Sequence, residues 1–263
     1  MPFITLTGAD DTIQHERLWH IAEASSLGCK NHGNIEWGIL YSTSNQGSGR
    51  YPSFGWIEKL ASTILVALGP SFALHVCGRA VHDFIDGRGH VSEIATAFNR
   101  IQLNFNSAEF SINEIRACLR RNPHKIIITQ HNKANQYLWA TFLDEEQNHA
   151  VLFDASCGKG LSPDRWYPAF KGLACGFAGG LGPLNLTCEL PRIFSKENLQ
   201  PLIDVPRASL SNGPWTRWVD MESSLRDAQD RFDLGLAEKC IAIAGEFYDQ
   251  HITVPRLARL QPA

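Results

Sequence analysis

Two short turns rich in glycine and serine, each directly after an apolar run, most constrain what this chain can fold into. Leu173–Ala178 leads into the turn Gly179–Pro183, and Trp215–Val219 leads into Asp220–Ser224. A strand that ends in such a turn before a helix exposes backbone N–H groups at the positive end of the helix dipole, where a phosphate group can bind. In a closed eight-stranded α/β barrel, the phosphate site is frequently built from the loops after strands seven and eight. The expected phosphate-binding residues are Gly179, Gly180, Ser223 and Ser224.

The length of the chain fits one such barrel. It has 263 residues, close to the roughly 250 that are typical of a single (β/α)8 barrel. No stretch resembles a linker between domains, and an apolar content of 44% is sufficient for a large core. The sequence therefore predicts an α/β fold, a single TIM barrel, with residues 1–263 forming one domain.

Charge and composition argue against several kinds of partner. A net charge of −3 and a pI near 6.4 do not favour nucleic-acid binding, which needs a basic stripe. The apolar run Ile64–Leu68 is too short to cross a bilayer, and residues 1–11 lack the pattern of a signal peptide. We therefore expect a cytoplasmic protein without membrane association. The seven cysteines are spread singly, which fits reduced thiols. Because neither C-x-x-C nor H-E-x-x-H occurs, no metal site and no cofactor are expected.

Strand-like runs alternate with helical patterns along the chain. Besides the two runs above, the predicted strands are Phe3–Thr7, Trp37–Tyr41, Phe72–Val76, Arg100–Asn104, Lys125–Thr129 and His149–Phe153. The predicted helices are Glu16–Leu27, Phe54–Leu68, Val81–Ile85, Ile112–Arg121, Lys133–Leu143 and Ala228–Gln250. This alternation is typical of a parallel sheet, either open or closed into a barrel.

An open nucleotide-binding sheet agrees less well with the glycine positions. The turn Thr7–Asp11 after the first strand lacks the dinucleotide fingerprint. Gly47–Gly49 supplies a G-x-G, but Pro52 stands where the third glycine belongs. Gly158-Lys159 is followed by glycine instead of the Ser or Thr of a P-loop. The closed barrel is therefore the preferred prediction.

Five segments resemble motifs of the phosphoribosylanthranilate isomerases of tryptophan biosynthesis. Ser48–Ser53 is similar to that family's Ser-Pro-Arg-Tyr-Val-Ser loop, and Ile101–Asn104 is similar to its Val-Gln-Leu-His strand. Leu152–Gly160 resembles its Leu-Leu-Asp-Ser strand with the glycine turn that follows. Ala178–Asn185 matches its Ala-Gly-Gly-Leu-x-Pro-x-Asn element, and Val219–Ser223 resembles its Val-Asp-Val-Ser-Ser. The order and spacing agree across nearly the whole chain.

The resemblance implies an Amadori rearrangement, in which an acid opens the ribose ring of an N-phosphoribosyl aryl amine and a base removes its C2 proton. Asp154 falls at the family's general acid, a role that suits a carboxyl at a strand end. Thr7 falls at its catalytic Cys, and Glu222 falls where it usually has Ser or Asn. The expected catalytic positions are therefore Asp154, Thr7 and Glu222. The expected substrate-binding residues are Arg50, whose guanidinium suits a carboxylate, Asn104 and Asp220.

Thr7 is the most serious departure from the family. A threonine hydroxyl has no accessible anion near neutral pH, so it cannot replace a thiolate as base without help. Asn104 replaces a histidine, and Arg226 replaces a glutamate. Because the phosphate end is kept better than the proton-transfer end, we expect little or no phosphoribosylanthranilate isomerase activity.

Structural roles without a ligand also fit some of these residues. The glycine turns can simply join a strand to a helix, and Asp154 can cap a helix or order a loop. Lone Cys and His residues such as Cys77, His75 and His131 are commonly packed and satisfied in a core.

Two classes of function stay open at this point. The first is an isomerase-like enzyme for a phosphosugar, with Asp154 as acid and Asp10, Glu222 or Cys77 as a replacement base. The second is a catalytically inactive barrel that binds a phosphorylated metabolite or an interaction partner. In both, the expected ligand is a phosphorylated small molecule; the oligomeric state stays open.

Overall fold

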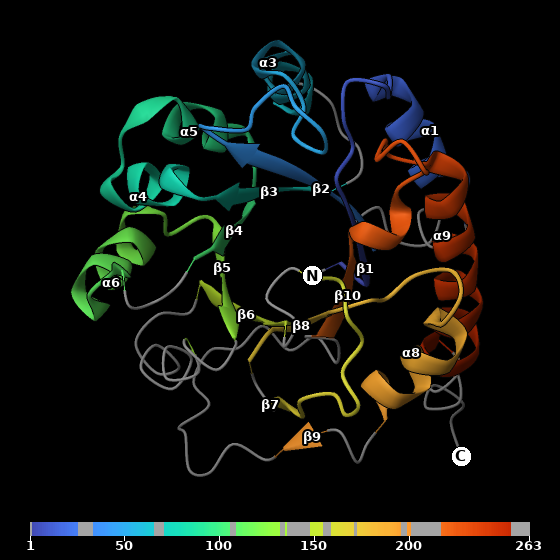
Figure 1. The fold of residues 1–263 in the computed structure, drawn as a ribbon. Coiled ribbons are helices and arrows are strands. Elements are labelled where there is room, and N and C mark those ends of the chain that lie inside the picture. The colour runs from blue at the N-terminus through green and yellow to red at the C-terminus, as the bar shows by residue number, and fades with distance from the viewer. Residues whose placement is uncertain are drawn as a thin grey trace, which may run out of the picture.

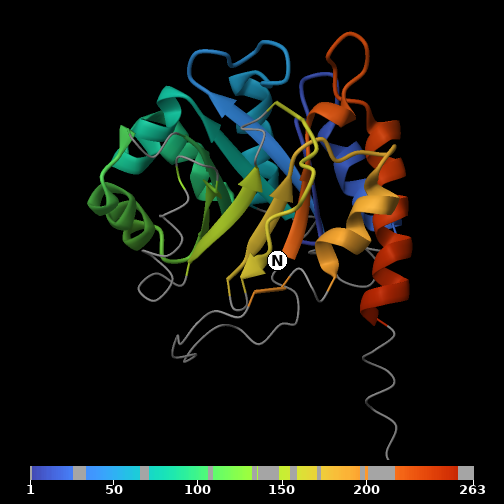
Figure 2. The ribbon, with the colours of Figure 1, turned by 60° about the horizontal axis from the view of Figure 1, so that its bottom comes forward.

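The barrel strands form a closed parallel sheet in the order β1-β10-β8-β6-β5-β4-β3-β2 (Figure 1). The computed structural model describes residues 2–25, 34–65, 71–105, 109–131, 135, 148–154, 159–170, 173–195, 199–200 and 217–253. The barrel closes where β1 pairs with β10, so segments from the two halves of the chain become neighbours. Seen from the side, the barrel strands run in one direction (Figure 2), which brings all their carboxyl ends to the same rim.

Each of the eight predicted strands is present, which confirms the predicted fold class. Their bounds are β1 Ile4–Thr7, β2 Ile35–Ser42, β3 Ser71–Cys77, β4 Arg100–Asn104, β5 Ile126–His131, β6 His149–Asp154, β8 Cys175–Ala178 and β10 Arg217–Met221. A further short pair, β7 (Ala169–Phe170) and β9 (Leu199–Gln200), lies outside the barrel and was not predicted.

The helices surround the barrel, and most agree with the prediction. Their bounds are α1 His15–Ala24, α3 Phe54–Ile64, α4 Arg79–Asp86, α5 Gly89–Ile94, α6 Ile112–Arg121, α8 Leu186–Phe194 and α9 Leu234–Tyr248. The prediction that the last helix starts at Ala228 is wrong. Asp233 caps α9 through its side chain, which accepts from the backbone N–H groups of Gly235 and Leu236, so the helix starts at Leu234. The predicted helix Lys133–Leu143 lies outside the described residues except for Asn135.

The buried apolar side chains form two groups, as the alternation of a barrel strand requires. The larger group packs between the strands and the surrounding helices. The smaller group fills part of the barrel interior and consists of Ile128, Ala150, Leu152 and Trp218. Gly176 makes room for the Trp218 indole, because a Cβ at this position would clash with the ring. Trp218 therefore fills the space that the glycine leaves, which closes the barrel below the rim.

A buried ion pair occupies another part of the interior. Arg100 on β4 donates to Glu36 on β2, and the two side chains are 5% and 1% exposed. Thr5 donates to the same carboxylate at 2.9 Å, and Ser71 donates at 3.2 Å. Removing one partner of such a pair typically costs about 3–5 kcal/mol, because a buried charge is left unpaired. The pair and the neighbouring Trp218 ring fill the barrel interior below the rim, so the rim is the accessible end of the barrel.

Among the described residues, no helix is long and apolar enough to span a membrane.

Candidate ligand-binding and catalytic site

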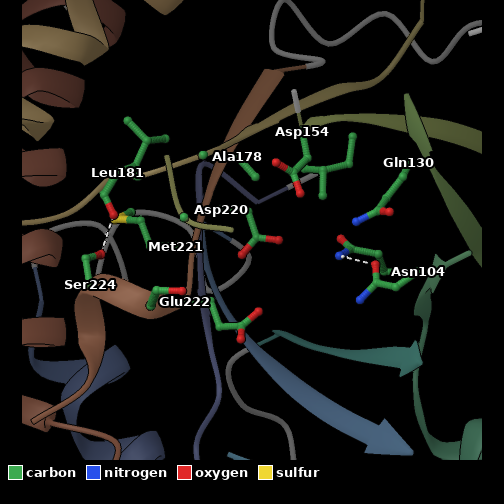
Figure 3. A pocket seen from close by; sticks show the side chains of 15 residues that line it. Asn104, Gln130, Asp154, Ala178, Leu181, Asp220, Met221, Glu222 and Ser224 are labelled. Atoms are coloured by element: carbon green, nitrogen blue, oxygen red, sulfur yellow. Dashed lines mark hydrogen bonds between the residues drawn. The ribbon is translucent and has the colours of Figure 1, made fainter. Parts of the chain in front are cut away.

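A cavity of about 310 Å³ opens at the carboxyl ends of the strands (Figure 3). This volume is at the lower end of the range for small-molecule sites, roughly 300–1,000 Å³. Eight of the residues singled out from the sequence line it: Asn104, Asp154, Gly179, Gly180, Asp220, Glu222, Ser223 and Ser224. The turns after β8 and β10 therefore face the same space as the polar ends of β4 and β6.

Three turns meet at one end of the cavity: Gly160–Ser162 after β6, Gly179–Gly182 after β8 and Ser223–Ser224 after β10. A Cβ at Gly180 would lie 2.6 Å from the backbone N of Ser162, and one at Gly160 would lie 3.1 Å from the Cβ of Ser223. Gly160, Gly179 and Gly180 also have φ values of 65°, 126° and 60°. Glycine is needed here both for the backbone conformation and for the close approach.

Asn185 and Ser224 fasten these turns together. The Asn185 amide donates to the carbonyl of Gly180 at 2.9 Å and to the Ser162 hydroxyl at 3.3 Å, and it accepts from the backbone N–H of Gly182 at 2.9 Å. The Ser224 hydroxyl donates to the Leu181 carbonyl (Figure 3). No described residue accepts a hydrogen bond from the backbone N–H of Gly179 or Gly180. Backbone N–H groups in glycine turns of this kind are suited to hold an anion.

Asp154 and Asp220 face the cavity from either side of a small residue. Each is in register with Ala178, on neighbouring strands, so their Cα atoms are roughly 10 Å apart. Figure 3 shows both carboxyl groups reaching the same space, and Ala178, on the strand β8 between theirs, contributes only a methyl group. The cavity thus carries two carboxyl groups at the same height of the barrel.

Thr7 contacts Asp220 across the closure of the barrel. The Thr7 hydroxyl donates to Asp220 Oδ1 at 2.7 Å, and the two residues are 1% and 6% exposed. Burial raises the pKa of Asp220 well above its ordinary value, and the negative charges of Glu222 and Glu36 act in the same direction. The hydrogen bond from Thr7 and the positive charge of Arg100 lower this pKa and so oppose the rise. Asp220 is therefore a carboxyl that accepts a proton more readily than an exposed aspartate.

A chain of polar side chains lines the opposite wall. The Gln102 amide donates to Asn104 Oδ1 at 3.0 Å, and Asn104 Nδ2 donates to Cys77 Sγ at 3.3 Å. Gln102 Nε2 also lies 3.2 Å from His75 Nδ1. Burial lowers the pKa of His75 to about 3, with a smaller effect from Arg100, so this imidazole is neutral at neutral pH. Burial raises the pKa of the Cys77 thiol, which disfavours its thiolate form.

Ion pairs join the loops around the cavity. Arg50, in the loop after β2, donates to Glu222 and lies 3.2 Å from Asp230. Arg226 lies 2.9 Å from the carboxylate of Asp10 in the loop after β1. Loops that follow three different strands are thereby held together.

Arg50 and Thr7 do not line the cavity, unlike the other predicted site residues. Whether Arg50 holds a ligand carboxylate stays a prediction, since the structure pairs its guanidinium with Glu222 and Asp230. Asp10 is paired with Arg226, and His131 contacts Phe153 on the outer side of the strands, with ring centroids 4.8 Å apart. Neither residue lines the cavity.

Gln102, Gln130 and Gly160 line the cavity but were not singled out from the sequence as site residues. Gln102 lies between Ile101 and Leu103 on β4, an alternation that was present in the sequence, whereas Gln130 lies between the polar residues Thr129 and His131 on β5 and carried no such signal. Gly160 belongs to a segment that was compared with a P-loop, but its contact with Ser223 depends on the tertiary fold. The described residues contain no group of three or more His, Cys, Asp or Glu side chains arranged to hold a metal ion.

No family model and no curated protein matches the sequence, but solved structures do resemble the fold. TrpF from Jonesia denitrificans superposes with a TM-score of 0.54 and 17% identity, over 95% of this chain and 98% of that one. Phosphoribosyl anthranilate isomerase from Thermus thermophilus gives 0.58 and 16%, over 93% and 99%. A phosphoribosyl anthranilate isomerase in complex with reduced 1-(o-carboxyphenylamino)-1-deoxyribulose 5-phosphate gives 0.52 and 15%, over 94% and 100%. Over nearly its whole length, the chain therefore has the (β/α)8-barrel fold of solved phosphoribosylanthranilate isomerases.

Proposed function

We propose that this protein binds a phosphorylated sugar in the cavity, with the phosphate at the three glycine and serine turns. The observation that carries the proposal is the convergence of the turns after β6, β8 and β10 on one end of a cavity of about 310 Å³. Backbone N–H groups of Gly179 and Gly180 supply donors without a positive side chain. This matters because no lysine or arginine lines the cavity in the part of the chain that the structure describes.

The other end of the cavity supports proton-transfer chemistry on the sugar. Asp154 lines it at the end of β6, where a carboxyl can protonate a ring oxygen. One structure of similar fold, a phosphoribosyl anthranilate isomerase, is in complex with reduced 1-(o-carboxyphenylamino)-1-deoxyribulose 5-phosphate. By analogy of fold and site, the reaction class is an aldose-ketose isomerisation with Asp154 as acid.

A catalytically inactive binding protein is the second candidate. It is favoured by Thr7, whose hydroxyl is committed to Asp220, and by Arg50, whose guanidinium is committed to Glu222 and Asp230. In this case the phosphate site stays functional and no turnover follows.

Calorimetric titration with ribose 5-phosphate and with ribose tests the phosphate site. We expect ribose 5-phosphate to bind and ribose to bind much more weakly. Gly180→Ala should weaken the binding of ribose 5-phosphate, because its Cβ would crowd Ser162. The matched control is Gly55→Ala in α3, where a Cβ would meet nothing within 4 Å.

Ser223→Asp gives a second test that does not depend on backbone strain. A carboxylate at this turn repels phosphate and should abolish the preference for ribose 5-phosphate over ribose. If the two sugars bind equally well to the wild type, or if neither Gly180→Ala nor Ser223→Asp changes the affinity in a folded variant, the phosphate site is not at these turns.

A further inference from the structure

Thr7, which stands where the phosphoribosylanthranilate isomerases have their catalytic Cys, has a carboxyl group directly beside it. Thr7 ends β1, and its hydroxyl donates to Asp220 on the neighbouring strand β10 at 2.7 Å. Asp220 lines the cavity, whereas Thr7 lies behind it. We propose that Asp220 is the base that removes the C2 proton of an aldose phosphate, and that Thr7 is the residue that positions its carboxylate. This inference rests on the proposed binding of a phosphorylated sugar in the same cavity.

The other candidate bases are engaged elsewhere. Glu222 lines the cavity, but it is paired with Arg50. Asp10 is paired with Arg226 and accepts from the backbone N–H of Phe232 at 2.9 Å. Cys77 does not line the cavity, and burial raises the pKa of its thiol. Asp220 lines the cavity, and one of its carboxylate oxygens is held by the hydroxyl of Thr7.

Thr7 is well placed to hold this carboxylate in one orientation. A β-branched side chain has little freedom at χ1, and Thr7 is almost fully buried. Its partner in register on β2 is Gly38, and a Cβ there would clash with the Thr7 hydroxyl. The glycine therefore leaves the space that the hydroxyl occupies. With Oδ1 of Asp220 fixed by Thr7, the second oxygen of the carboxylate is left for a ligand in the cavity.

The surroundings of Asp220 suit a base that works near neutral pH. Burial and nearby negative charge raise the pKa of its carboxyl, so its carboxylate is a stronger base than that of an exposed aspartate. The charged groups around it are Glu222 on the same segment, Glu36 on β2, Arg100 on β4 and Asp154 on β6. The hydrogen bond from Thr7 lowers this pKa, so Thr7 keeps part of the carboxyl ionised.

The proton transfer balances without a further reactant. Asp154 donates a proton to the ring oxygen, the ring C1–O bond breaks, and the C1 hydroxyl passes its proton to the Asp154 carboxylate, which gives the open aldehyde and restores the acid. The carboxylate of Asp220 takes the C2 proton, the electron pair of the C2–H bond forms the C1=C2 double bond, and Asp154 protonates the carbonyl oxygen, which gives the enediol. The enediol then receives a proton at C1 from Asp220, and its C2 hydroxyl passes a proton to the Asp154 carboxylate, which gives the ketose and returns both carboxyl groups to their starting forms. Atoms and electrons are conserved, and no oxidant is needed.

Exchange of the C2 proton of ribose 5-phosphate in D2O, followed by proton NMR, tests this assignment. We expect the wild type to exchange this proton and Asp220→Asn to exchange it about 10²–10⁴-fold more slowly, the usual loss for a general base. The affinity for ribose 5-phosphate should change little. Asp86→Asn, an exposed carboxyl paired with Arg88, is the matched control and should exchange like the wild type.

The pH profile separates a positioning role of Thr7 from a merely structural one. Thr7→Val removes the hydrogen bond that lowers the pKa of Asp220, so the rise of exchange with pH should move to higher pH. Thr7→Ser keeps a hydroxyl and should restore the wild-type profile. Thr63→Val in α3, whose hydroxyl bonds only to a helix carbonyl among the described residues, should leave the profile unchanged.

The outcomes distinguish the inference from the proposed function. If ribose 5-phosphate binds no better than ribose, the proposed phosphate site fails. If it binds but the wild type shows no exchange, or if folded Asp220→Asn exchanges as fast as the wild type, the assignment of Asp220 as base is overturned and the phosphate site stands.

Discussion

Arg50 and Glu222 set the charge beside the proposed phosphate site, and removing one or the other should change phosphate affinity in opposite directions. Glu222 immediately precedes Ser223 and lines the same cavity. From the dimensions of adjacent residues, its carboxylate lies within about 7 Å of a phosphate held at Ser223. Arg50 donates to this carboxylate, and the two side chains are 29% and 32% exposed. The pair is therefore neither fully hydrated nor fully buried.

Coulomb's law gives the size of the effect. Two unit charges about 7 Å apart, at an effective dielectric constant of about 40 for a half-exposed site, interact by about 1 kcal/mol, or roughly fivefold in affinity. Arg50→Met leaves Glu222 without this partner and should raise the Kd for ribose 5-phosphate about fivefold. Glu222→Gln removes the repulsion and should lower the Kd by a similar factor. The double variant should return close to the wild type, because the two opposing charges are removed together.

Calorimetric titrations of the four proteins at low and at high salt measure this cycle. Both shifts should shrink at high salt, because half-exposed charges are screened. Arg88→Met, in the connection between α4 and α5, changes the net charge by the same amount and should have no effect. If Arg50→Met and Glu222→Gln both leave the Kd unchanged at low salt, Glu222 does not lie beside the phosphate and the reasoning is refuted.

Three further results are expected. Asp220→Asn should stabilise the protein at neutral pH, because the carboxyl has a raised pKa in the folded protein but a pKa of about 3.9 in the unfolded chain. As the pH rises between these two pKa values, the wild type loses about 1.4 kcal/mol of stability for each pH unit that separates them. Equal urea midpoints for the two proteins at pH 8 would contradict this expectation. Burial lowers the pKa of His75 to about 3 and that of His149 to about 4. As the pH drops below about 6.5, only the unfolded chain gains protons at these residues, so the stability of the folded protein should fall. In urea titrations between pH 7 and pH 4, His149→Gln should remove up to about 3 kcal/mol of this loss. Turnover of freshly generated phosphoribosylanthranilate should be weak, because Arg50, the residue expected to hold the ligand carboxylate, is already paired with Glu222 and Asp230. Robust turnover by the wild type in a fluorescence assay would show this expectation to be wrong.

The barrel and the meeting of its glycine turns at one rim could be predicted because their signals are local. An apolar strand followed by Gly179-Gly180 is readable in one stretch of sequence, and parallel strands necessarily bring such turns to one rim. The start of α9 was missed for a local reason as well, since the capping role of Asp233 was overlooked in a longer apolar pattern. The element order, taken with the glycines, was therefore sufficient for the architecture.

The arrangement at the carboxyl end of the cavity could not be predicted in the same way, because its contacts join distant parts of the chain. Thr7 and Asp220 are separated by 213 positions and meet only when β1 closes on β10. Arg50 and Glu222 are 172 positions apart, and nothing near Arg50 in the sequence shows that its guanidinium is already paired. The Thr7 substitution, seen in the sequence alone, suggested the loss of the base, whereas the structure shows the carboxyl of Asp220 beside Thr7.

The two ends of the cavity together fix how a ligand would lie. Ala178, between Asp154 and Asp220 in register, is followed directly along the chain by Gly179 and Gly180. Two residues of extended chain span about 7 Å, so the carboxyl groups and the proposed phosphate donors are separated by only a few bond lengths of a small sugar. An aldose with a terminal phosphate therefore places its ring oxygen and C2 near the carboxyl groups when its phosphate reaches the turns. The reverse orientation would bring the phosphate against Asp154 and Asp220, where like charges repel.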